Sequence, residues 1–521
     1  MQSKTVPPVE PAISPGLRRY LYFTAALTGA AILIVEILGA KMLSPYVGTS
    51  HFVWTAQIAV TLVSLATGYY YGGWLVDRSQ RLRRLYNCIL LAAIYLSLTV
   101  AVIEPIAYGC LRFQLATGAL LASAILYFVP LTLLATTGPF LVRVLTQSVS
   151  TVGGNVGRLS AVSTLGSVVG TVLIGYVLIP LFPNSVTMYL TAVLLLVVTA
   201  GYYLTWGKSA TGKTALAVGA VLGLAMGGVG VWRESHASLD DLEELARANS
   251  NFGRLQVLQN GEGRRYYLND YLTQNTYDPA EKKSISMFTA MLYGLAHAYT
   301  PQVKDVLCIG MGVGIVPMQF ANEGAQVDVV EINPAVAPLA KAYFDLKPER
   351  FNLVIGDGRY FINRATKQYD AIILDAFLGD SSPSHLMSRE AFGAMRRVLR
   401  PGGVLVINSF GDFDRGKDFF TASLDKTLKA VFRSVRIHAS PHGNIFFVAS
   451  DQPELAILNP PDLELPHPWI RQQVQDAFAS IQHMNPRHGR VLTDDFNPGE
   501  FYDAANREKI RRSLAAGMRR R

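Results

Sequence analysis

The sequence predicts two dissimilar parts: a polytopic α-helical membrane domain, and after it a doubly wound α/β domain preceded by a small β unit. Three observations lead to this prediction. About seven apolar stretches fill residues 1–232, each long enough to cross about 30 Å of hydrocarbon. The remainder alternates short apolar strands with helical segments, as in a parallel sheet covered on both faces. Residues 1–232 also carry 13 Lys and Arg against 4 Asp and Glu, which accounts for the whole net charge of +9.

The composition excludes several classes of function. The basic residues form short clusters between apolar stretches rather than one face of a folded domain, so the charge does not indicate a nucleic-acid partner. The three cysteines, Cys88, Cys110 and Cys308, are too few and too widely spaced for a disulfide framework or a zinc site. No metal is therefore expected.

Each apolar stretch is predicted to be a membrane-spanning helix. The stretches lie at 20–42, 55–76, 86–107, 115–142, 159–181, 185–206 and 214–232. The first has no small-residue cleavage site after it, so we expect it to remain as a helix rather than to be removed as a signal peptide. The prediction is a multi-pass protein of the cell membrane, in contact with the lipid bilayer.

Lysines and arginines in the loops predict the orientation. If every stretch crosses, eleven basic residues lie on the side of the N-terminus and three on the other, which places the N-terminus in the cytoplasm. Seven crossings would put the second part on the opposite face. An even number of crossings would keep the second part in the cytoplasm. This would be the case if the stretch at 115–142 or the one at 214–232 did not cross the membrane as a simple span. The sequence leaves this choice open.

Two features of the apolar stretches need an explanation. Glu36 lies in the middle of the first stretch, where an ionisable group is costly, so it marks either a functional site or a carboxyl group packed inside the bundle. Gly166, Gly170 and Gly175 have the spacing of closely packed helices, and we interpret them as packing residues.

The second part is predicted to begin with a small β unit over residues 245–300 and to continue as an α/β domain over 301–521. Two alternating segments on either side of a Gly-rich turn, at 254–259 and 264–268, indicate a β-hairpin. The strands of the main sheet are predicted at 305–309, 326–330, 352–355, 371–374, 403–407, 434–438 and 444–449.

A Gly-rich turn after the first of these strands predicts a nucleotide or nucleoside site. Gly310, Gly312 and Gly314 open a helix, and small residues there let the backbone approach a ligand. Glu331 ends the second strand about 20 residues later, where a carboxylate can accept both ribose hydroxyl protons. A dinucleotide and an adenosyl sulfonium both fit this pattern.

Two further acids follow the next two strands. Asp357 and Asp375 are expected to lie with Glu331 at one edge of the sheet. The plain alternative for any one of them is a helix N-cap. His385 follows in a loop that could cover the site, and we expect it to be structural rather than a base.

Several motifs of the chain are typical of one known family. They are Val306-Leu-Cys-Ile-Gly-Met-Gly-Val-Gly314, Val330-Glu-Ile-Asn333, Gly356-Asp357, Leu374-Asp-Ala-Phe-Leu-Gly-Asp-Ser-Ser-Pro383 with His385-Leu-Met, the region of Tyr46, Gly48 and Trp54, and the tail Leu492-Thr-Asp-Asp495. By these motifs residues 250–450 resemble the spermidine synthase (polyamine aminopropyltransferase) family, and the whole chain resembles its membrane-fused members. The resemblance implies a small β domain followed by a Rossmann-like, methyltransferase-type domain, and a homodimer is compatible with it.

The resemblance also implies roles for individual residues. Glu331 would hold the ribose of decarboxylated S-adenosylmethionine, Asp357 with Gly358 the adenine, and Gln274 would line the same pocket. Asp375 would accept the proton of a small-molecule amine such as putrescine as that amine attacks.

The sequence departs from the family pattern at several acidic positions. Val313 stands where the family has an acid, Thr289-Ala290 replaces a His-Glu pair, and Leu378 replaces a second acid. Asp380 is the residue expected to substitute for that acid in binding the substrate.

Three hypotheses follow. The first is an aminopropyltransferase, and the second is an S-adenosylmethionine-dependent methyltransferase that uses the same nucleoside pocket. The third is a transporter-like membrane protein whose second part senses a nucleoside without turning it over. Retention of Asp375 favours an enzyme, whereas the missing acids favour a changed acceptor.

Overall fold

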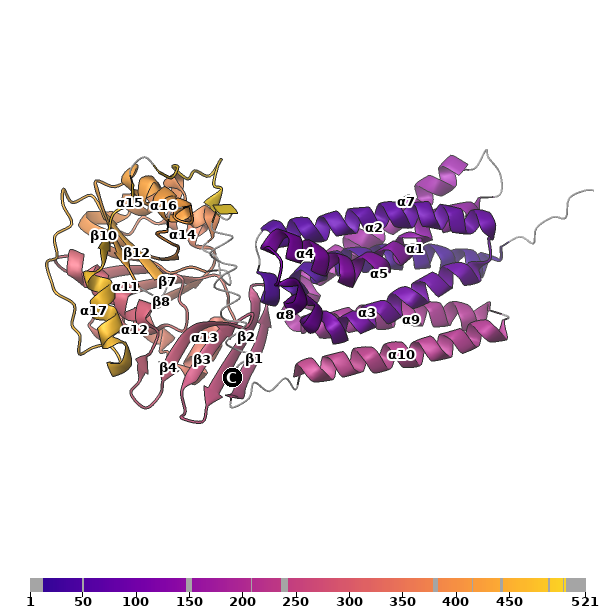
Figure 1. The fold of residues 1–521 in the computed structure, drawn as a ribbon, viewed down its shortest axis with the longest axis horizontal. Helices are drawn as coiled ribbons and strands as arrows, with labels where there is room; N and C mark the ends of the chain where they lie inside the picture. The colour runs from indigo at the N-terminus through magenta and orange to yellow at the C-terminus, as the bar shows by residue number, and fades with distance from the viewer. Residues whose placement is uncertain are drawn as a thin grey trace, which may run out of the picture. The chain divides into compact units, whose positions relative to one another are not determined.

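The structure is a computed structural model with two compact units (Figure 1). It describes residues 13–48, 51–146, 152–207, 209–235, 242–377, 383–414, 416–440, 444–485, 488–499 and 501–502. The helical unit comprises residues 1–43 and 52–237, and the α/β unit comprises residues 44–51 and 238–521. Each unit is described by itself.

The helical unit contains long helices and two segments built from several shorter ones. The long helices are α1 (Pro15–Val47), α2 (His51–Arg78), α3 (Leu82–Cys110), α9 (Asn184–Thr205) and α10 (Ala210–Ser235). The first composite segment is α4 (Leu115–Ser123), η1 (Ala124–Phe128), α5 (Val129–Ala135) and α6 (Thr137–Leu145). The second is α7 (Val152–Leu173), η3 (Ile174–Leu178) and α8 (Ile179–Leu181). The turns η1 and η3 are π-helical and lie just before Pro130 and Pro180, because proline cannot donate the backbone hydrogen bond that a regular turn needs.

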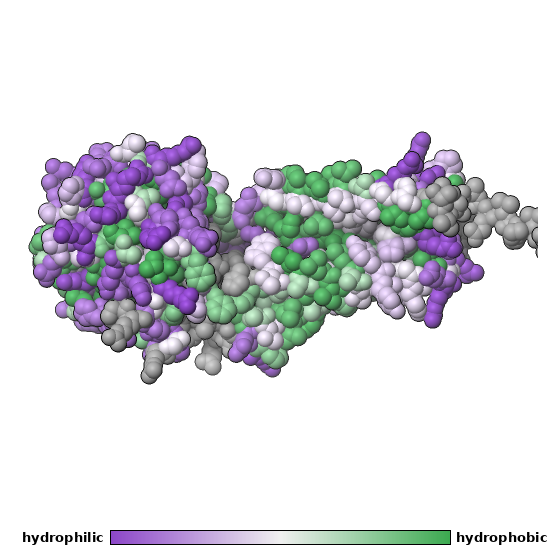
Figure 2. All heavy atoms as spheres, turned by 90° about the horizontal axis from the view of Figure 1, so that it is seen from above, coloured by the Kyte–Doolittle hydropathy of each residue, from purple (hydrophilic) through white to green (hydrophobic). Residues whose placement is uncertain are grey.

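Among the described residues, seven helical segments are long and apolar enough to cross a membrane. They coincide with the seven predicted stretches, so the prediction of seven apolar helices is confirmed. Hydrophobic residues cover much of the face of this unit seen in Figure 2. Large apolar side chains such as Leu62, Leu165, Val169 and Tyr176 are exposed, and contiguous apolar surface of this kind is rare on soluble monomers.

Two of the three predicted packing glycines lie where α7 meets α1. A Cβ atom at Gly170 would lie 2.7 Å from the Ala30 carbonyl oxygen, and one at Gly166 would overlap the Ala26 carbonyl. Only glycine permits this approach of the two backbones. Gly175 has open space around it, so its prediction as a packing residue is wrong. Glu36 is half-buried on α1, and its site role stays a prediction.

The α/β unit begins with a five-stranded antiparallel sheet in sequential order. Its strands are β1 (Leu242–Ser250), β2 (Gly253–Asn260), β3 (Arg265–Asn269), β4 (Leu272–Asp278) and β5 (Lys283–Ser284). The predicted hairpin is β2 with β3, in which Leu258 pairs with Tyr266. Sequence alternation does not predict β1 and β4, because β1 buries neither face fully and β4 carries polar residues at most positions.

The main sheet has eight strands in the order β13-β11-β12-β10-β9-β6-β7-β8. Its strands are β6 (Asp305–Ile309), β7 (Gln326–Glu331), β8 (Asn352–Ile355), β9 (Tyr369–Leu374), β10 (Leu399–Phe410), β11 (Ser434–Ala439), β12 (Asn444–Ser450) and β13 (Ile481–Gln482). The five strands from β6 to β10 are parallel, whereas β11, β12 and β13 join antiparallel. The link from β11 to β12 is too short for a crossover, so the two strands must pair antiparallel.

Helices cover both faces of this sheet, as expected for a doubly wound fold (Figure 1). One face packs against α11 (Met287–Tyr299), α12 (Ile315–Asn322), α13 (Val336–Tyr343) and α17 (Arg471–Ala479). The other packs against α14 (Gly358–Arg364), α15 (Arg389–Arg397) and α16 (Phe419–Lys429). Because β6 to β10 are parallel, the residues that follow them meet at one edge, where open α/β sheets bind ligands.

Candidate active site

A cavity of about 390 Å³ lies at the carboxyl ends of the parallel strands. Seven predicted site residues line it: Gln274, Gly310, Gly312, Glu331, Asp357, Gly358 and Asp375. Gly314 does not line it but borders a neighbouring cavity of about 260 Å³. Asp380 lies outside the described residues. The structure therefore brings most of the predicted site together around one hollow.

The Gly-rich turn lies directly against the end of β9. Gly310 has a φ of 91°, and a Cβ atom there would overlap the Asp375 carbonyl oxygen. Its backbone N–H donates to the Val330 carbonyl at 2.9 Å. Gly310 is therefore needed both for its left-handed backbone and for the close approach of this turn to Asp375.

Glu331 ends β7 and is buried, with both carboxylate oxygens in use. The Met311 N–H donates to Oε2 at 3.0 Å, and the Asn333 N–H donates to Oε1 at 2.8 Å. Burial raises the pKa of Glu331, and the hydrogen bonds from Asn333 and Met311 oppose that rise. Each oxygen has a second lone pair, so the carboxylate is able to accept two hydroxyl protons of a ribose.

Asp375 follows β9 and lies at the bottom of the turn formed by Gly310. Its Oδ1 accepts a hydrogen bond of 2.9 Å from Nδ2 of Asn408, at the end of β10. Asp375 is partly exposed and lines the cavity, and the protein around it replaces much of the water that would solvate the carboxylate. This burial raises the pKa of Asp375 to about 6, with the Asn408 hydrogen bond opposing the rise and the charge of Glu331 adding to it. The group is mostly ionised at neutral pH and can accept a proton.

Asn408 and Asn444 are site residues that sequence reasoning missed. Asn444 donates to Oδ1 of Asn408 at 3.0 Å, which turns the Asn408 amide nitrogen toward Asp375. Both asparagines line the cavity. The signal in the sequence is the polar pair Asn408-Ser409, which interrupts an apolar strand at its carboxyl end.

Asp357 caps a helix and also contacts a histidine of the cavity wall. Its Oδ1 accepts a hydrogen bond of 2.8 Å from the Tyr360 N–H and so caps α14, which confirms the N-cap interpretation for this residue. Its Oδ2 lies 3.0 Å from Nε2 of His385. His385, expected from the sequence to be structural, also lines the cavity. Its contact with Asp357 joins the loop after β8 to the loop after β9 in the cavity wall.

Comparison with known proteins shows which family the sequence matches. Residues 286–442 match the model of the spermine/spermidine synthase domain. Over 249 residues the chain is 36% identical to a polyamine aminopropyltransferase of Vibrio vulnificus, an alignment that covers 43% of this chain and 78% of that protein. The chain belongs to the spermine/spermidine synthase family. It is therefore a transferase, which favours the two enzymatic hypotheses over the nucleoside sensor.

This synthase-family chain is also similar to a protein named for another chemistry and to a solved probable spermidine synthase. It is 32% identical over 221 residues to an N-terminal histidine N-methyltransferase of Emericella nidulans, covering 38% of this chain and 39% of that protein. A solved probable spermidine synthase from Corynebacterium glutamicum aligns with 19% identity and a TM-score of 0.39, covering 48% of this chain and 95% of that one.

The departures from the family pattern lie in different places, and Leu378 is outside the described residues. Val313 is buried in the hydrophobic core behind the turn and does not line the cavity, whereas Thr289 does. Phe377 and Phe410 also line the cavity, with ring centroids 5.2 Å apart. Phe377 follows Asp375 closely in the sequence, and Phe410 follows Asn408. Among the described lining residues, the acids are Glu331, Asp357 and Asp375.

Proposed function

We propose that the chain is a membrane-anchored aminopropyltransferase. It transfers the aminopropyl group of decarboxylated S-adenosylmethionine to a small-molecule amine such as putrescine. The observation that carries this proposal is the position of Asp375, a carboxylate with its pKa raised to about 6, in the cavity that also holds Glu331 and Asp357. A carboxylate in such a position suits proton transfer, and the two other acids suit an adenosyl group.

The donor would lie along the edge of the sheet. Glu331 holds the ribose hydroxyls, Asp357 and Gly358 contact the adenine, and the backbone at Gly310 and Gly312 borders the sulfonium end. Gln274 closes the pocket from β4. Gly314, which borders the neighbouring cavity, shapes the start of α12. We retain Asp380 as a ligand of the amine.

Asp375 would make the acceptor nucleophilic. An amine with a pKa near 10.4 is protonated at neutral pH, so it must lose a proton before or as it attacks. Its lone pair then forms a C–N bond to the propyl carbon while the C–S⁺ bond breaks, and the bonding pair returns to sulfur as neutral methylthioadenosine. Asp375 takes the amine proton. General-base assistance of this kind contributes about 10²–10⁴ in rate.

The helical unit would anchor the enzyme in the cell membrane with the N-terminus in the cytoplasm. Its seven apolar helices support the anchoring, and the excess of lysines and arginines on the side of the N-terminus supports the orientation. We also propose three domains: a transmembrane domain at 1–232, a small β-rich part at 245–300 and a catalytic domain at 301–521. The homodimer stays a prediction. Full-length protein should stay in the membrane pellet after alkaline carbonate extraction, and its release would contradict the proposed anchoring.

Methyl transfer from S-adenosylmethionine is the second candidate. Two observations favour it: the similarity to a histidine N-methyltransferase and the aromatic wall formed by Phe377 and Phe410, where a diamine would find few carboxylates. The same Glu331 and Asp357 would hold the adenosyl group.

Calorimetric binding to detergent-purified full-length protein separates these candidates. The ligands are decarboxylated S-adenosylmethionine, S-adenosylmethionine and methylthioadenosine. We expect the decarboxylated donor to bind more tightly than S-adenosylmethionine. The reverse preference would support methyl transfer, and a protein that binds none of the three would contradict both.

A further inference from the structure

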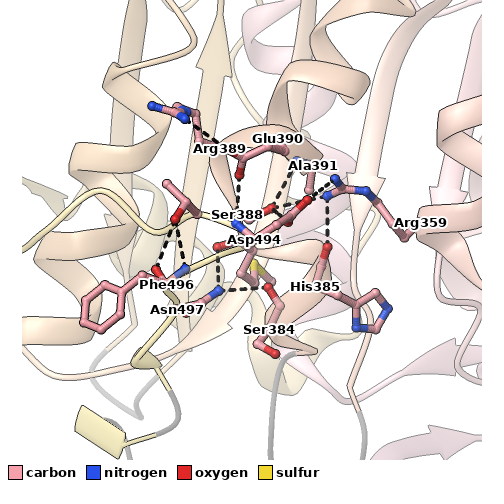
Figure 3. Close-up of polar contacts among 12 residues, drawn as sticks. Arg359, Ser384, His385, Ser388, Arg389, Glu390, Ala391, Asp494, Phe496 and Asn497 are labelled. Carbon is pink, nitrogen blue, oxygen red and sulfur yellow. Dashed lines mark hydrogen bonds and ion pairs between the residues drawn. The ribbon is translucent and has the colours of Figure 1, made fainter.

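The C-terminal segment of the described α/β unit contacts the turn that carries the cavity residue His385. We call residues 492–497 the C-terminal clasp. The segment lies against the turn of residues 383–388 and against the start of α15 (Figure 3). It is anchored at its own start, where Leu492 is fully buried, its N–H donates to Oγ1 of Thr427 at 2.8 Å, and its carbonyl accepts from the Arg389 N–H at 2.8 Å.

Asp494 joins two segments that lie next to cavity residues in the sequence. One carboxylate oxygen forms an ion pair of 2.7 Å with Arg359, which lies on α14 next to the cavity residues Asp357 and Gly358. The other oxygen accepts a hydrogen bond from Ser388, a buried residue that caps α15 after β9. Asp494 therefore ties the first turn of α14, which follows β8, to Ser388 at the start of α15.

Arg359 extends this connection to His385. Its NH1 group donates to the His385 carbonyl at 3.1 Å and to Oγ of Ser388 at 3.2 Å. The Arg359 side chain is only 17% exposed, against 48% for Asp494, so its fork of donors is largely shielded from water and the ion pair holds it in one orientation. The His385 side chain then meets Asp357 at 3.0 Å.

Asn497 holds the same turn from the other side. Its side-chain amide donates to the Ser384 carbonyl at 2.9 Å and to the Met387 carbonyl at 3.3 Å. Its own oxygen accepts from the Gly499 N–H at 3.1 Å, which orients the amide. The turn that carries His385 is thus fixed at its start by Asn497 and at its end by Asp494 through Ser388.

We propose that Asp494 and Asn497 are positioning residues for the nucleoside site, because they hold His385 against Asp357 and so keep that wall of the cavity in its binding shape. This inference rests on the proposed function, in which Asp357 contacts the adenine. A wall that is already ordered before the ligand arrives binds more tightly than one that must be ordered on binding. Loss of the clasp therefore weakens nucleoside binding and leaves the proton transfer at Asp375 intact.

The test compares two neighbouring aspartates in the full-length, detergent-purified protein. Asp494→Asn removes the charge that holds Arg359, whereas Asp495→Asn makes the same chemical change at an exposed residue with no described contact. With methylthioadenosine as the calorimetric probe, Asp494→Asn raises the Kd on the order of tenfold, and Asp495→Asn leaves it unchanged. Steady-state kinetics show a higher KM for the donor with kcat and the putrescine KM preserved, and Asp494→Glu restores part of the affinity.

A second variant separates a positioning role from a loss of structure, and thermal unfolding compares the melting temperatures of both variants with that of the wild type. Asn497→Ser removes the two donors to the turn without touching the ion pair, and it also raises the Kd for methylthioadenosine at unchanged kcat. A lower kcat with unchanged Kd and KM in both variants would show a purely structural role and overturn the inference. If Asp494→Asn bound methylthioadenosine with wild-type affinity, the inference would be overturned and the proposed function would stand. If the wild-type protein bound no adenosyl ligand, the proposed function would be overturned as well.

Discussion

The side-chain amide of Asn408 donates a hydrogen bond of 2.9 Å to Oδ1 of Asp375, and this bond connects the ends of two adjacent parallel strands. It stabilises the ionised form of a carboxylate whose burial favours the protonated form. Asn444 holds the amide in that orientation. Burial therefore raises the proton affinity of Asp375, and the hydrogen bond from Asn408, held in place by Asn444, opposes that rise.

Replacing Asn408 should move the pH dependence of the reaction. In Asn408→Ala, the pKa of Asp375 rises above about 6 because the stabilising hydrogen bond is lost. The acid limb of the profile of kcat against pH then shifts upward by about one pH unit, as expected for a bond to a charged group. Ser409→Ala, at the next position of the same strand, is the control and leaves the limb in place.

Replacing Asp375 should separate catalysis from binding. Asp375→Asn keeps the size of the side chain and a contact to Asn408 but accepts no proton, so kcat falls about 10²–10⁴-fold. The affinity for methylthioadenosine, measured by calorimetry, stays close to that of the wild type. Full turnover in this variant would exclude Asp375 as the proton acceptor.

The same carboxylate should make the folded protein less stable as the pH rises. Folded Asp375 keeps its proton up to about pH 6, whereas the unfolded chain releases it near pH 3.9. Between these values the folded state binds more protons, so stability falls with increasing pH and stays lower above pH 6. Asp375→Asn removes this cost, worth at most about 3 kcal/mol. Thermal unfolding should show the variant more stable than the wild type at pH 8 and the difference absent at pH 3.

Glu331→Gln tests the ribose contact. The amide has one acceptor oxygen in place of two, so it loses one hydroxyl contact and one backbone N–H loses its partner. The Kd for methylthioadenosine should rise on the order of 10- to 100-fold. Glu349→Gln, at an exposed residue of the 3-10 helix Pro348–Arg350 before β8, is the matched control. Equal affinities in the two variants would place the ribose elsewhere.

Two neighbouring glycines should respond differently to alanine. Gly310→Ala brings a Cβ atom onto the Asp375 carbonyl, at a φ of 91°, so both overlap and backbone strain oppose folding. Gly312→Ala meets no atom within 4 Å and has a φ of 52°, so it costs only about 1–2 kcal/mol of backbone strain. Thermal unfolding should rank Gly310→Ala well below Gly312→Ala, and equal melting temperatures would refute the close approach.

The sequence is most informative where periodicity and topology determine the position of a residue. Seven apolar lengths predict seven helices, and strand ends predict that Glu331, Asp357 and Asp375 share one edge, because parallel strands end together. Spacing alone groups Gly314 with Gly310. The start of α12 turns it toward the neighbouring cavity, a change of direction that a one-dimensional pattern does not contain.

The supporting contacts that sequence reasoning missed join distant segments. Asn408 follows Asp375 by 33 positions and Asp494 follows Arg359 by 135, and nothing in the local sequence pairs them. His385 looks structural in the sequence because a lone histidine in a loop has no local partner. Its role in the cavity wall depends on Asp357, which it meets only after the sheet has formed. Local pattern finds side chains at strand ends, whereas their supporting contacts require the fold.

Product analysis by mass spectrometry tests the proposed reaction most directly. The detergent-purified full-length protein is incubated with decarboxylated S-adenosylmethionine and putrescine, and in parallel with S-adenosylmethionine and the same amine. We predict methylthioadenosine and spermidine in the first reaction, with both products lost in Asp375→Asn. S-adenosylhomocysteine and a methylated amine in the second reaction, with no spermidine in the first, would contradict aminopropyl transfer.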